Sequence, residues 1–435
     1  MIQSARLWLA ATVAVAAPLA AQSPASVADA PQSATIAPAP AVDLGVAAYY
    51  ASHPGIQVWL GPPEARAAAA KLPDILNRAP FDGLAAGPEL ATKVEAALAS
   101  GLPADDQAIS DAWVQYVRAL KAPVEGVSYG DEELAPVKPS AEAILDAATR
   151  APSLSAHIDE ISSVNPLYAA LRDDAAKAGG IPDLRVRATL NRLRLVPAKG
   201  RAIIVDIPAA KLMMLEDGKV VDSMKVIVGK KTGATPILAS TIHYVTFNPV
   251  WHIPPDIARV RVAPVVVKRG VGYLTLARYQ TVEKFGGEKE VPIDPTTVDW
   301  KAVAAGKAEV FVRQLSGPQN MMGKVKFGFV NDSGVFLHDT PDKKLFARDR
   351  RYLSHGCIRL ERPQALAAWL LGPNGPEPSG EPEELVRVDK GVPIYLTYLT
   401  AQPGDGGEIA YAEDIYGLDT VGAAKAVMAT AATAQ

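Results

Sequence analysis

The sequence is 435 residues long, with 49% hydrophobic residues, a formal net charge of -3 and one cysteine. This mild acidity gives no general electrostatic attraction for nucleic acid or anionic lipid, so the composition argues against a nucleic-acid binder. One cysteine excludes a disulfide within the chain and metal sites built on cysteine clusters, and the six histidines lack metal-ligand spacing. We therefore expect no metal and no other cofactor.

Residues 1–21 have the pattern of a secretory signal peptide, with a positive charge at Arg6, an apolar run and then small residues. The run is short for a membrane span. We therefore expect cleavage near Gln22, rather than a retained anchor, and an exported protein without stable membrane insertion. Residues 22–44 are rich in alanine, proline and serine, which is typical of a flexible linker.

Residues 45–198 have a mostly helical pattern. Apolar side chains recur at spacings of three and four in residues 104–120, at Ile109, Trp113, Tyr116, Val117 and Leu120. Residues 88–100 and 140–150 show a similar alanine- and leucine-rich periodicity. The pattern predicts an α-helical domain, in which we find no evident chemistry.

From Arg201 the apolar period changes to two. Short β-type runs occupy residues 201–208, 211–215, 219–229, 324–330, 335–338 and 392–400. Turn residues separate two pairs of these runs, at 216–219 and 331–334. These features predict a mainly antiparallel β domain over residues 199–400, and therefore an α+β chain.

Three further segments complete the expected organisation. Between about residues 251 and 300 the β pattern breaks into prolines, glycines and charges, which predicts an inserted cap that acts as a lid or binding element. A helix is expected directly after Glu361, with Pro363 in its first turn and Gly372 as its stop. Residues 401–435 form a C-terminal extension.

The single cysteine lies in the stretch YLSHGCIRLE, residues 352–361. A thiol is a useful nucleophile only as a thiolate, so it needs a nearby base or cation and donors for the oxyanion that it creates. His355 and His338 are the candidate bases. Because side chains alternate along a strand, His338 can face a cleft while Leu337 faces the core.

The residues around these histidines have narrower expected roles. The side chain of Asp339 is badly placed to orient His338, although its backbone carbonyl could hold an imidazole N–H. Gly356 fits a tight turn, and the N–H groups of Gly356 and Cys357 could form an oxyanion hole. Against this, a lone cysteine is often a small buried hydrophobe. Ser354 lacks the GxSxG context of a serine nucleophile.

The combination of a histidine, an intervening segment and SHGC resembles the signature of the L,D-transpeptidase family, the YkuD-type catalytic domain of bacterial cell-wall enzymes. The likeness extends to residues 312–341, to residues 235–258 and, near the C-terminus, to residues 392–401 and 411–419. Fragments in residues 163–174 and 190–197 resemble the large, scaffold-bearing YcbB-like subgroup. The resemblance implies a YkuD-like β-sandwich with a cap, preceded by a helical scaffold domain.

Position by position, the resemblance makes Cys357 the nucleophile and His338 its general base, supported by the Asp339 carbonyl. It assigns Ser354, His355 and Gly356 to the signature turn. Arg359 is expected to shape the site or bind a substrate carboxylate, with a structural ion pair as the alternative.

The sequence departs from the subgroup at several places. His252 stands where the subgroup tends to have asparagine, and Met321 and Met322 replace a smaller pair. Between Leu171 and Leu190 there is no room for the usual peptidoglycan-binding module. Wall recognition is then expected from the helical domain, the cap or a cell-wall protein partner.

The family resemblance implies periplasmic acyl transfer between peptidoglycan stem peptides through a Cys357 thioester, which cross-links two third-position residues, and inactivation by carbapenems. Two alternatives keep this chemistry but change the acceptor: water in an L,D-carboxypeptidase, or a protein lysine in lipoprotein attachment or its reversal. A third alternative is a non-catalytic cell-wall scaffold protein. A papain-like protease fits poorly, because the CGSCW-type context is absent.

Overall fold

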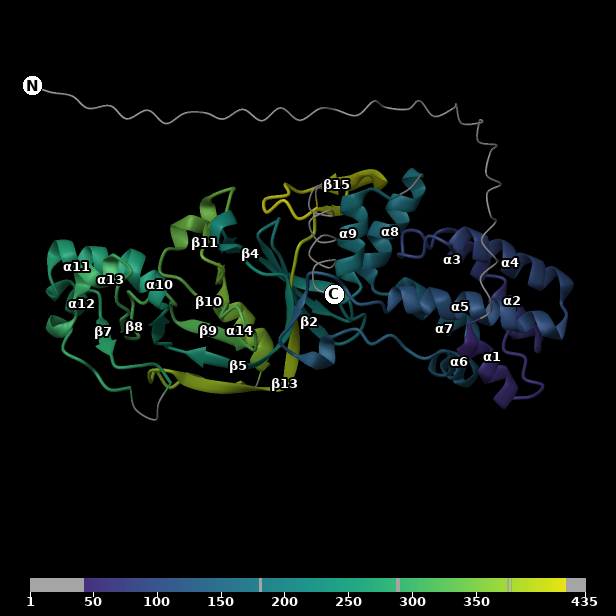
Figure 1. Cartoon of the computed structure of the whole chain (residues 1–435), viewed down its shortest axis with the longest axis horizontal. Helices are drawn as coiled ribbons and strands as arrows, with labels where there is room; N and C mark the ends of the chain where they lie inside the picture. Colours follow the sequence, from purple (N-terminus) through teal and green to yellow (C-terminus); the bar gives the residue numbers. More distant parts are fainter. Residues whose placement is uncertain (1–42, 180–181, 287–289, 374, 377, 420–435) are drawn as a thin grey trace, which may run out of the picture. The chain divides into compact units, whose positions relative to one another are not determined.

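The computed structural model describes residues 43–419, apart from residues 180–181, 287–289, 374 and 377. The expected signal peptide, nearly all of the expected linker and residues 420–435 lie outside the described residues. Among the residues that are described, none of the helices combines the length and the apolar character needed to span a bilayer. The fold is α+β as predicted, with a helical part followed by a β-rich part (Figure 1).

The helical part is built from amphipathic helices. The helices are α1 (Leu44–Ser52), α2 (Pro63–Ala69), α3 (Leu72–Asn77), α4 (Gly87–Ser100), α5 (Asp106–Leu120), α6 (Ala141–Arg150), α7 (Leu154–Ser163), α8 (Pro166–Ala178) and α9 (Leu184–Leu193). The stripe predicted on α5 is confirmed, because Ile109, Trp113 and Tyr116 are buried. The Asn165 side chain begins α8 by accepting a hydrogen bond from the Tyr168 N–H at 2.9 Å.

The β-rich part is organised around one large sheet. Its strands are β1 (Ser128–Tyr129), β2 (Arg201–Asp206), β3 (Lys211–Glu216), β4 (Lys219–Gly229), β5 (Leu238–Phe247), β9 (Val325–Phe329), β10 (Leu337–His338), β11 (Tyr352–Ser354), β12 (Ile358–Leu360) and β13 (Glu384–Thr397). The order is β1-β5-β13-β2-β3-β4-β12-β10-β9, with β11 on β4. An additional pairing of β9 with β5 closes the path. Most neighbours are antiparallel, as predicted.

Alternate side chains of β2 enter two different cores. Ile203 packs inside the closed sheet, whereas Ile204 packs outward in one cluster with the helical part. This explains why β2 is an unbroken apolar run rather than a half-polar one. The helical part therefore shares a hydrophobic core with the outer face of the sheet.

Local chemistry sets the connections of the sheet. Asp217 and Gly218 join β3 to β4 with φ values of 48° and 71°, the positive pair that a two-residue hairpin turn needs. Helix α14 (Pro363–Leu371) follows β12 and packs on β13 and β9. Strand β13 begins at Glu384, whereas the sequence predicted a strand only from residue 392. The first part of the strand was not predicted, because a register shift between Arg387 and Val392 interrupts the alternation of side chains between the two faces of the sheet.

The inserted cap has a hydrophobic core of its own. It contains β6 (Trp251–Ile253), α10 (Pro255–Ile257), the π-helix η4 (Ala258–Val262), α11 (Ala263–Arg269), α12 (Gly272–Leu276), β7 (Tyr279–Val282), α13 (Trp300–Ala304) and β8 (Phe311–Gln314). Its antiparallel sheet has the order β6-β8-β7, and Ile253, Trp300 and Val312 are buried together beneath its helices. The cap thus continues past residue 300, because β8 is its central strand.

A short antiparallel pair follows β13 in the C-terminal segment, formed by β14 (Ala401–Pro403) and β15 (Ile409–Tyr411). Both strands contact α8, and β14 also contacts α9. The described part of the C-terminal segment therefore lies against the helical part.

Candidate active site

Cys357 lies in a tight turn between β11 and β12. Gly356 has a φ of 123°, in a region that side chains with a Cβ rarely adopt. The Ser354 hydroxyl is buried and accepts a hydrogen bond from the Gly356 N–H at 3.2 Å. The Cys357 side chain is half-buried. The turn therefore presents the thiol without enclosing it.

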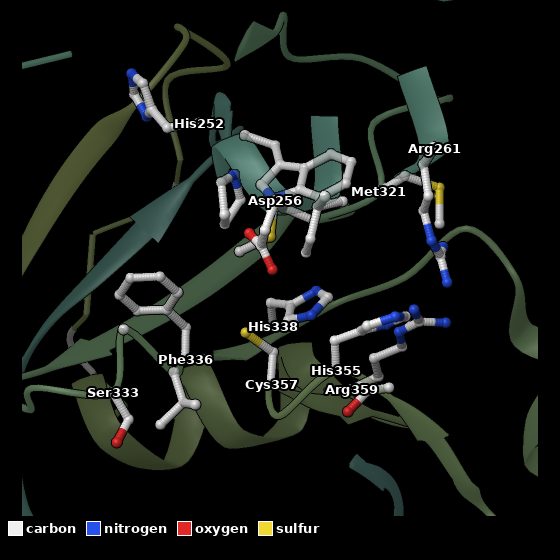
Figure 2. Close-up of a pocket in the computed structure, with 17 residues that line it drawn as sticks. His252, Asp256, Arg261, Met321, Ser333, Phe336, His338, His355, Cys357 and Arg359 are labelled. Atoms are coloured by element: carbon white, nitrogen blue, oxygen red, sulfur yellow. The ribbon is translucent and has the colours of Figure 1, made fainter. Parts of the chain in front are cut away.

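His338 ends strand β10 and faces the same cavity as Cys357. Leu337 is in the sheet core, whereas Phe336 and His338 line the cavity, which is the alternation that the sequence predicts. Figure 2 shows the His338 ring beside the Cys357 sulfur. His338 is 5% exposed, so its protonation depends on its protein surroundings.

The hydrogen bond of His338 determines its tautomer. Its Nδ1 lies 2.5 Å from the Asp339 carbonyl oxygen, which can only accept, so Nδ1 carries the proton. Nε2 then keeps its lone pair. The Asp339 carboxylate points elsewhere, to the Lys324 N–H at 2.8 Å and to the Lys343 ammonium at 2.7 Å. Asp339 orients His338 through its backbone and not through its side chain.

The sheet register places a cation on each side of His338. In the sheet, His338 pairs with Lys326 of β9 and with Arg359 of β12. Residues directly paired across strands project from the same face. The three side chains form a row across β9, β10 and β12, which we call the cationic row. The Lys326 ammonium also lies 4.5 Å from the centroid of the Phe336 ring.

Burial favours the neutral form of both the thiol and the imidazole, and the cationic row adds to this effect only at the imidazole. Burial, followed by the charge of Arg359, lowers the pKa of His338 from 6.5 to about 4. Burial raises the pKa of the Cys357 thiol above its ordinary value, although Arg359 and Lys326 act in the opposite direction. At neutral pH the resting site therefore holds a thiol and a neutral imidazole.

Arg359 has little to neutralise it. Its Nε is buried without a hydrogen-bond partner among the described residues. Burial lowers the pKa of Arg359, and Arg261 of the cap lowers it further by like-charge repulsion. Two guanidinium groups, one from the sheet and one from the cap, therefore line the same side of the cavity. Figure 2 shows the Arg261 side chain extending from η4 towards Arg359 and His355.

The cavity has a volume of about 240 Å³ and lies between the sheet and the cap. The sheet contributes the thiol and the imidazole, and the cap contributes Trp251 and Arg261. His252 also lines it, where its Nε2 lies 2.9 Å from the Glu290 carboxylate. Other lining residues are Pro254, Asp256, Ile257, Met321, Met322, Ser333, Gly334, Val335, Phe336, Ser354, His355 and Arg359. Apolar walls and convergent cations suit a peptide that carries carboxylates.

His355 has a different environment from His338. It lines the cavity but is largely exposed. Partial desolvation, followed by the positive charge of Lys230, lowers its pKa. Gly233 packs so closely that a Cβ there would lie 3.1 Å from the His355 Cα. His355 therefore contributes its backbone to the packing of the turn, and its side chain lies at the rim.

Comparison with known proteins identifies two domains in the chain. Residues 200–395 match the L,D-transpeptidase catalytic domain family, YkuD, and residues 45–174 match the Scaffold domain family. The chain therefore contains an L,D-transpeptidase catalytic domain preceded by a Scaffold domain. A curated Haemophilus influenzae protein named "Putative L,D-transpeptidase" is 32% identical over 237 residues, which are 52% of this chain and 46% of that protein. The chain thus spans about half the length of this curated relative.

Solved L,D-transpeptidases give weaker alignments. One from Mycobacterium smegmatis is 16% identical, and its alignment has a TM-score of 0.23 and covers 45% of this chain and 58% of that protein. Another, LdtMt1 in complex with imipenem, is 13% identical, covers 46% and 59% and has a TM-score of 0.23. The fold assignment here therefore rests on the observed strands and helices and on the family matches.

Several residues of this L,D-transpeptidase site were absent from the sequence prediction. Lys326 and Arg261 are cations whose distance from Cys357 in the sequence conceals their proximity. The alternation of residues 324–330 already put Lys326 on the face opposite to Phe327, but strand partners were needed to place it beside His338. Arg261 lies in a segment with no regular period, so no local signal identified it.

Proposed function

We propose that this chain is a peptidoglycan L,D-transpeptidase in which Cys357 is the nucleophile and His338 its general base. The observation that carries the proposal is the His338 geometry: its Nδ1 is held by the Asp339 carbonyl, which leaves the Nε2 lone pair free in the cavity that the Cys357 thiol also lines (Figure 2). A neutral imidazole next to a thiol is the arrangement that activates a cysteine nucleophile.

In the first step, Nε2 of His338 takes the thiol proton and the thiolate attacks the carbonyl carbon of the third residue of a tetrapeptide stem. The tetrahedral intermediate collapses, the C–N bond to the terminal D-alanine breaks, and His338 returns the proton to the departing amine. A thioester on Cys357 remains. In the second step an acceptor amine, from the third residue of another stem, attacks the thioester, and the thiol is regenerated.

The cationic row favours the charged species on this path. The thiolate and the oxyanion both carry a negative charge that Arg359 and Lys326 attract in a partly desolvated site. Two backbone hydrogen bonds lower the pKa of the Cys357 thiol, first that of Phe336 and then, more weakly, that of Cys357 itself, and these two groups are the proposed oxyanion donors. The sequence predicted the N–H groups of Gly356 and Cys357 as the two oxyanion donors. The Gly356 N–H instead donates a hydrogen bond to the Ser354 hydroxyl.

Arg359 and Arg261 are proposed to bind a carboxylate of the stem peptide. They approach from the sheet and from the cap, and neither forms an ion pair with a carboxylate among the described residues. A stem carboxylate between them would relieve their repulsion and fix the scissile bond over the thiol. We also propose that the protein acts in the periplasm after residues 1–21 are removed. The helical part is proposed to recruit cell-wall proteins.

The test is the intact mass of the protein after incubation with imipenem, for the wild type, Cys357→Ala and His338→Ala. We expect one imipenem adduct on the wild type, none on Cys357→Ala and slow formation on His338→Ala. An unmodified, folded wild type would contradict the proposal. Mass spectrometry of products from stem peptides then identifies the acceptor, because water gives a shortened peptide and an amine gives a cross-linked one.

A further inference from the structure

The carbonyl that precedes Cys357 is held by a buried hydroxyl from the loop between β4 and β5. Thr235 Oγ1 donates to the Gly356 carbonyl at 2.7 Å and accepts from the Gly229 N–H at 2.9 Å. Thr235 is 2% exposed, so water has no access to replace it. The end of β4 and the nucleophile turn are therefore joined through one side chain.

A tyrosine from the C-terminal segment holds Thr235 in turn. The Tyr416 hydroxyl donates to the Gly229 carbonyl at 2.6 Å and accepts from the Thr235 N–H at 3.2 Å. Its ring stacks on Tyr398, with centroids 5.5 Å apart and an angle of 24° between the planes. The Tyr416 N–H also donates to the Tyr398 hydroxyl at 2.8 Å. Tyr416 therefore has both its ring and its hydroxyl fixed.

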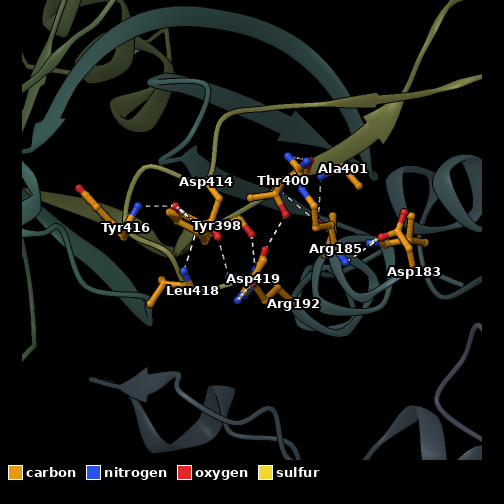
Figure 3. A network of polar contacts seen from close by, with 12 residues as sticks. Asp183, Arg185, Arg192, Tyr398, Thr400, Ala401, Asp414, Tyr416, Leu418 and Asp419 are labelled. Atoms are coloured by element: carbon orange, nitrogen blue, oxygen red, sulfur yellow. Dashed lines mark hydrogen bonds and ion pairs between the residues drawn. The ribbon is translucent and has the colours of Figure 1, made fainter. Parts of the chain in front are cut away.

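The same segment is bonded to the helical part (Figure 3). Arg192 of α9 donates to both carboxylate oxygens of Asp419, at 2.9 and 2.7 Å, and to the Tyr398 carbonyl at 2.6 Å. Asp414 accepts from the Tyr398 hydroxyl at 2.6 Å and from the Asp419 N–H at 3.0 Å. A continuous set of polar contacts thus runs from α9 to the turn that holds Cys357.

We propose that Tyr416 is a positioning residue for Cys357, acting through Thr235 and the Gly356 carbonyl. Tyr416 does not line the cavity and touches no reacting atom, so its contribution is to the position of the thiol relative to His338. The proposal rests on the proposed role of Cys357 as nucleophile. A displacement of about 1 Å between reacting groups can cost on the order of 100-fold in rate.

The test compares four variants: Tyr416→Phe, Thr235→Val, Thr235→Ser and Tyr411→Phe. Tyr411 is the matched control, because it lies in the same segment but its hydroxyl contacts Asp183 next to α9 and not the β4 end. Two rates are measured on each protein: acylation of Cys357 by imipenem and alkylation by iodoacetamide across pH. The single cysteine makes both signals unambiguous.

We expect Tyr416→Phe and Thr235→Val to slow the maximal rate of acylation about 10- to 100-fold, with little change in the half-saturating imipenem concentration. The pH profile of alkylation should also shift in these two variants. Thr235→Ser keeps the hydroxyl and should restore the rate, and Tyr411→Phe should match the wild type. Thermal unfolding of each variant separates a loss of folded protein from a loss of rate.

Equal rates for Tyr416→Phe and Tyr411→Phe, on a wild type that imipenem acylates, would overturn the positioning role and leave the proposed function intact. A wild type that imipenem does not acylate would overturn the proposed function. In that case the iodoacetamide profiles still decide whether Tyr416 positions the thiol, because alkylation requires no catalysis.

Discussion

Two groups of charged side chains are buried in this protein, and they differ in how well their polar atoms are satisfied. In the helical part, the Asp82 carboxylate accepts hydrogen bonds from Tyr116 at 2.9 Å and Tyr168 at 2.6 Å and lies 3.7 Å from the Arg172 guanidinium. In the catalytic domain, the cationic row has no carboxylate bonded to it among the described residues.

The difference indicates what each group is for. Burial raises the pKa of Asp82, and Arg172 and the two tyrosine hydroxyls oppose that increase, so the cluster compensates its own desolvation. Lys326 and Arg359 instead lower the pKa of the histidine between them. Neither forms an ion pair among the described residues, and Glu383 and Asp342 attract them only from a longer distance. A buried cluster whose polar groups are all hydrogen-bonded stabilises the fold. Buried cations without a bonded carboxylate can instead gain free energy when a negatively charged ligand binds to them.

The largest expected effect is on chemistry at the cationic row. His338→Gln should slow imipenem acylation about 100- to 10,000-fold, because the proposed general base is lost. Stopped-flow or mass-spectrometric acylation rates measure this, with circular dichroism as the check on folding. A loss of less than tenfold would mean that another group removes the thiol proton.

The corresponding change in the helical part should affect stability and not chemistry. Asp82→Ala should lower the free energy of unfolding by about 3–5 kcal/mol, because two buried tyrosine hydroxyls lose their acceptor and the buried Arg172 cation loses one of its two carboxylate neighbours. Urea unfolding measures this. Imipenem acylation per folded molecule should stay at the wild-type rate, and a large decrease would show that the two groups are coupled.

Acid should destabilise the catalytic domain through His338. Its pKa in the folded protein is about 4, below the unfolded value of 6.5, so the unfolded chain takes up the proton first as the pH falls. The stability due to the neutral imidazole is present above pH 6.5 and is lost as the pH falls through about 4.

At about 1.4 kcal/mol for each pH unit, the wild type should lose roughly 3 kcal/mol more than His338→Gln between pH 7 and pH 4. Unfolding in urea at both pH values gives the comparison. Parallel losses in the two proteins would contradict a desolvated, neutral His338.

The smallest effect is expected at Arg359. Arg359→Gln should slow acylation about 10- to 100-fold, because the proposed charged hydrogen-bond donor to the ligand is lost. It should also move the acid limb of the rate profile from about pH 4 towards 6.5, since Arg359 helps to lower the pKa of His338.

Stability of this variant should be unchanged or higher, because the Nε of Arg359 has no partner. Arg362→Gln is the matched control: Arg362 is exposed, and its guanidinium pairs with Asp222 at 2.7 Å outside the cavity. A stability loss in Arg359→Gln without a shift of the acid limb would favour the structural ion-pair alternative for Arg359.

The parts of the fold that were predicted well depend on neighbours in the chain. The apolar stripe on α5, the Asp217–Gly218 turn and the opposite directions of Leu337 and His338 all follow from helix, turn and strand periods over a few residues. The cap boundary and the start of β13 were missed, because β8 and a register shift depend on pairing with distant strands.

The sequence by itself determined the two halves, the single thiol and the histidine that faces the cavity, because turn chemistry and side-chain alternation are local properties of the chain. Only the tertiary structure decided what surrounds them. The pairing of β9, β10 and β12 placed Lys326 and Arg359 beside His338, the cap brought Arg261 to the cavity near Arg359, and the C-terminal segment carried Tyr416 to Thr235. These contacts join residues far apart in sequence, and sheet register and core packing set which of them meet.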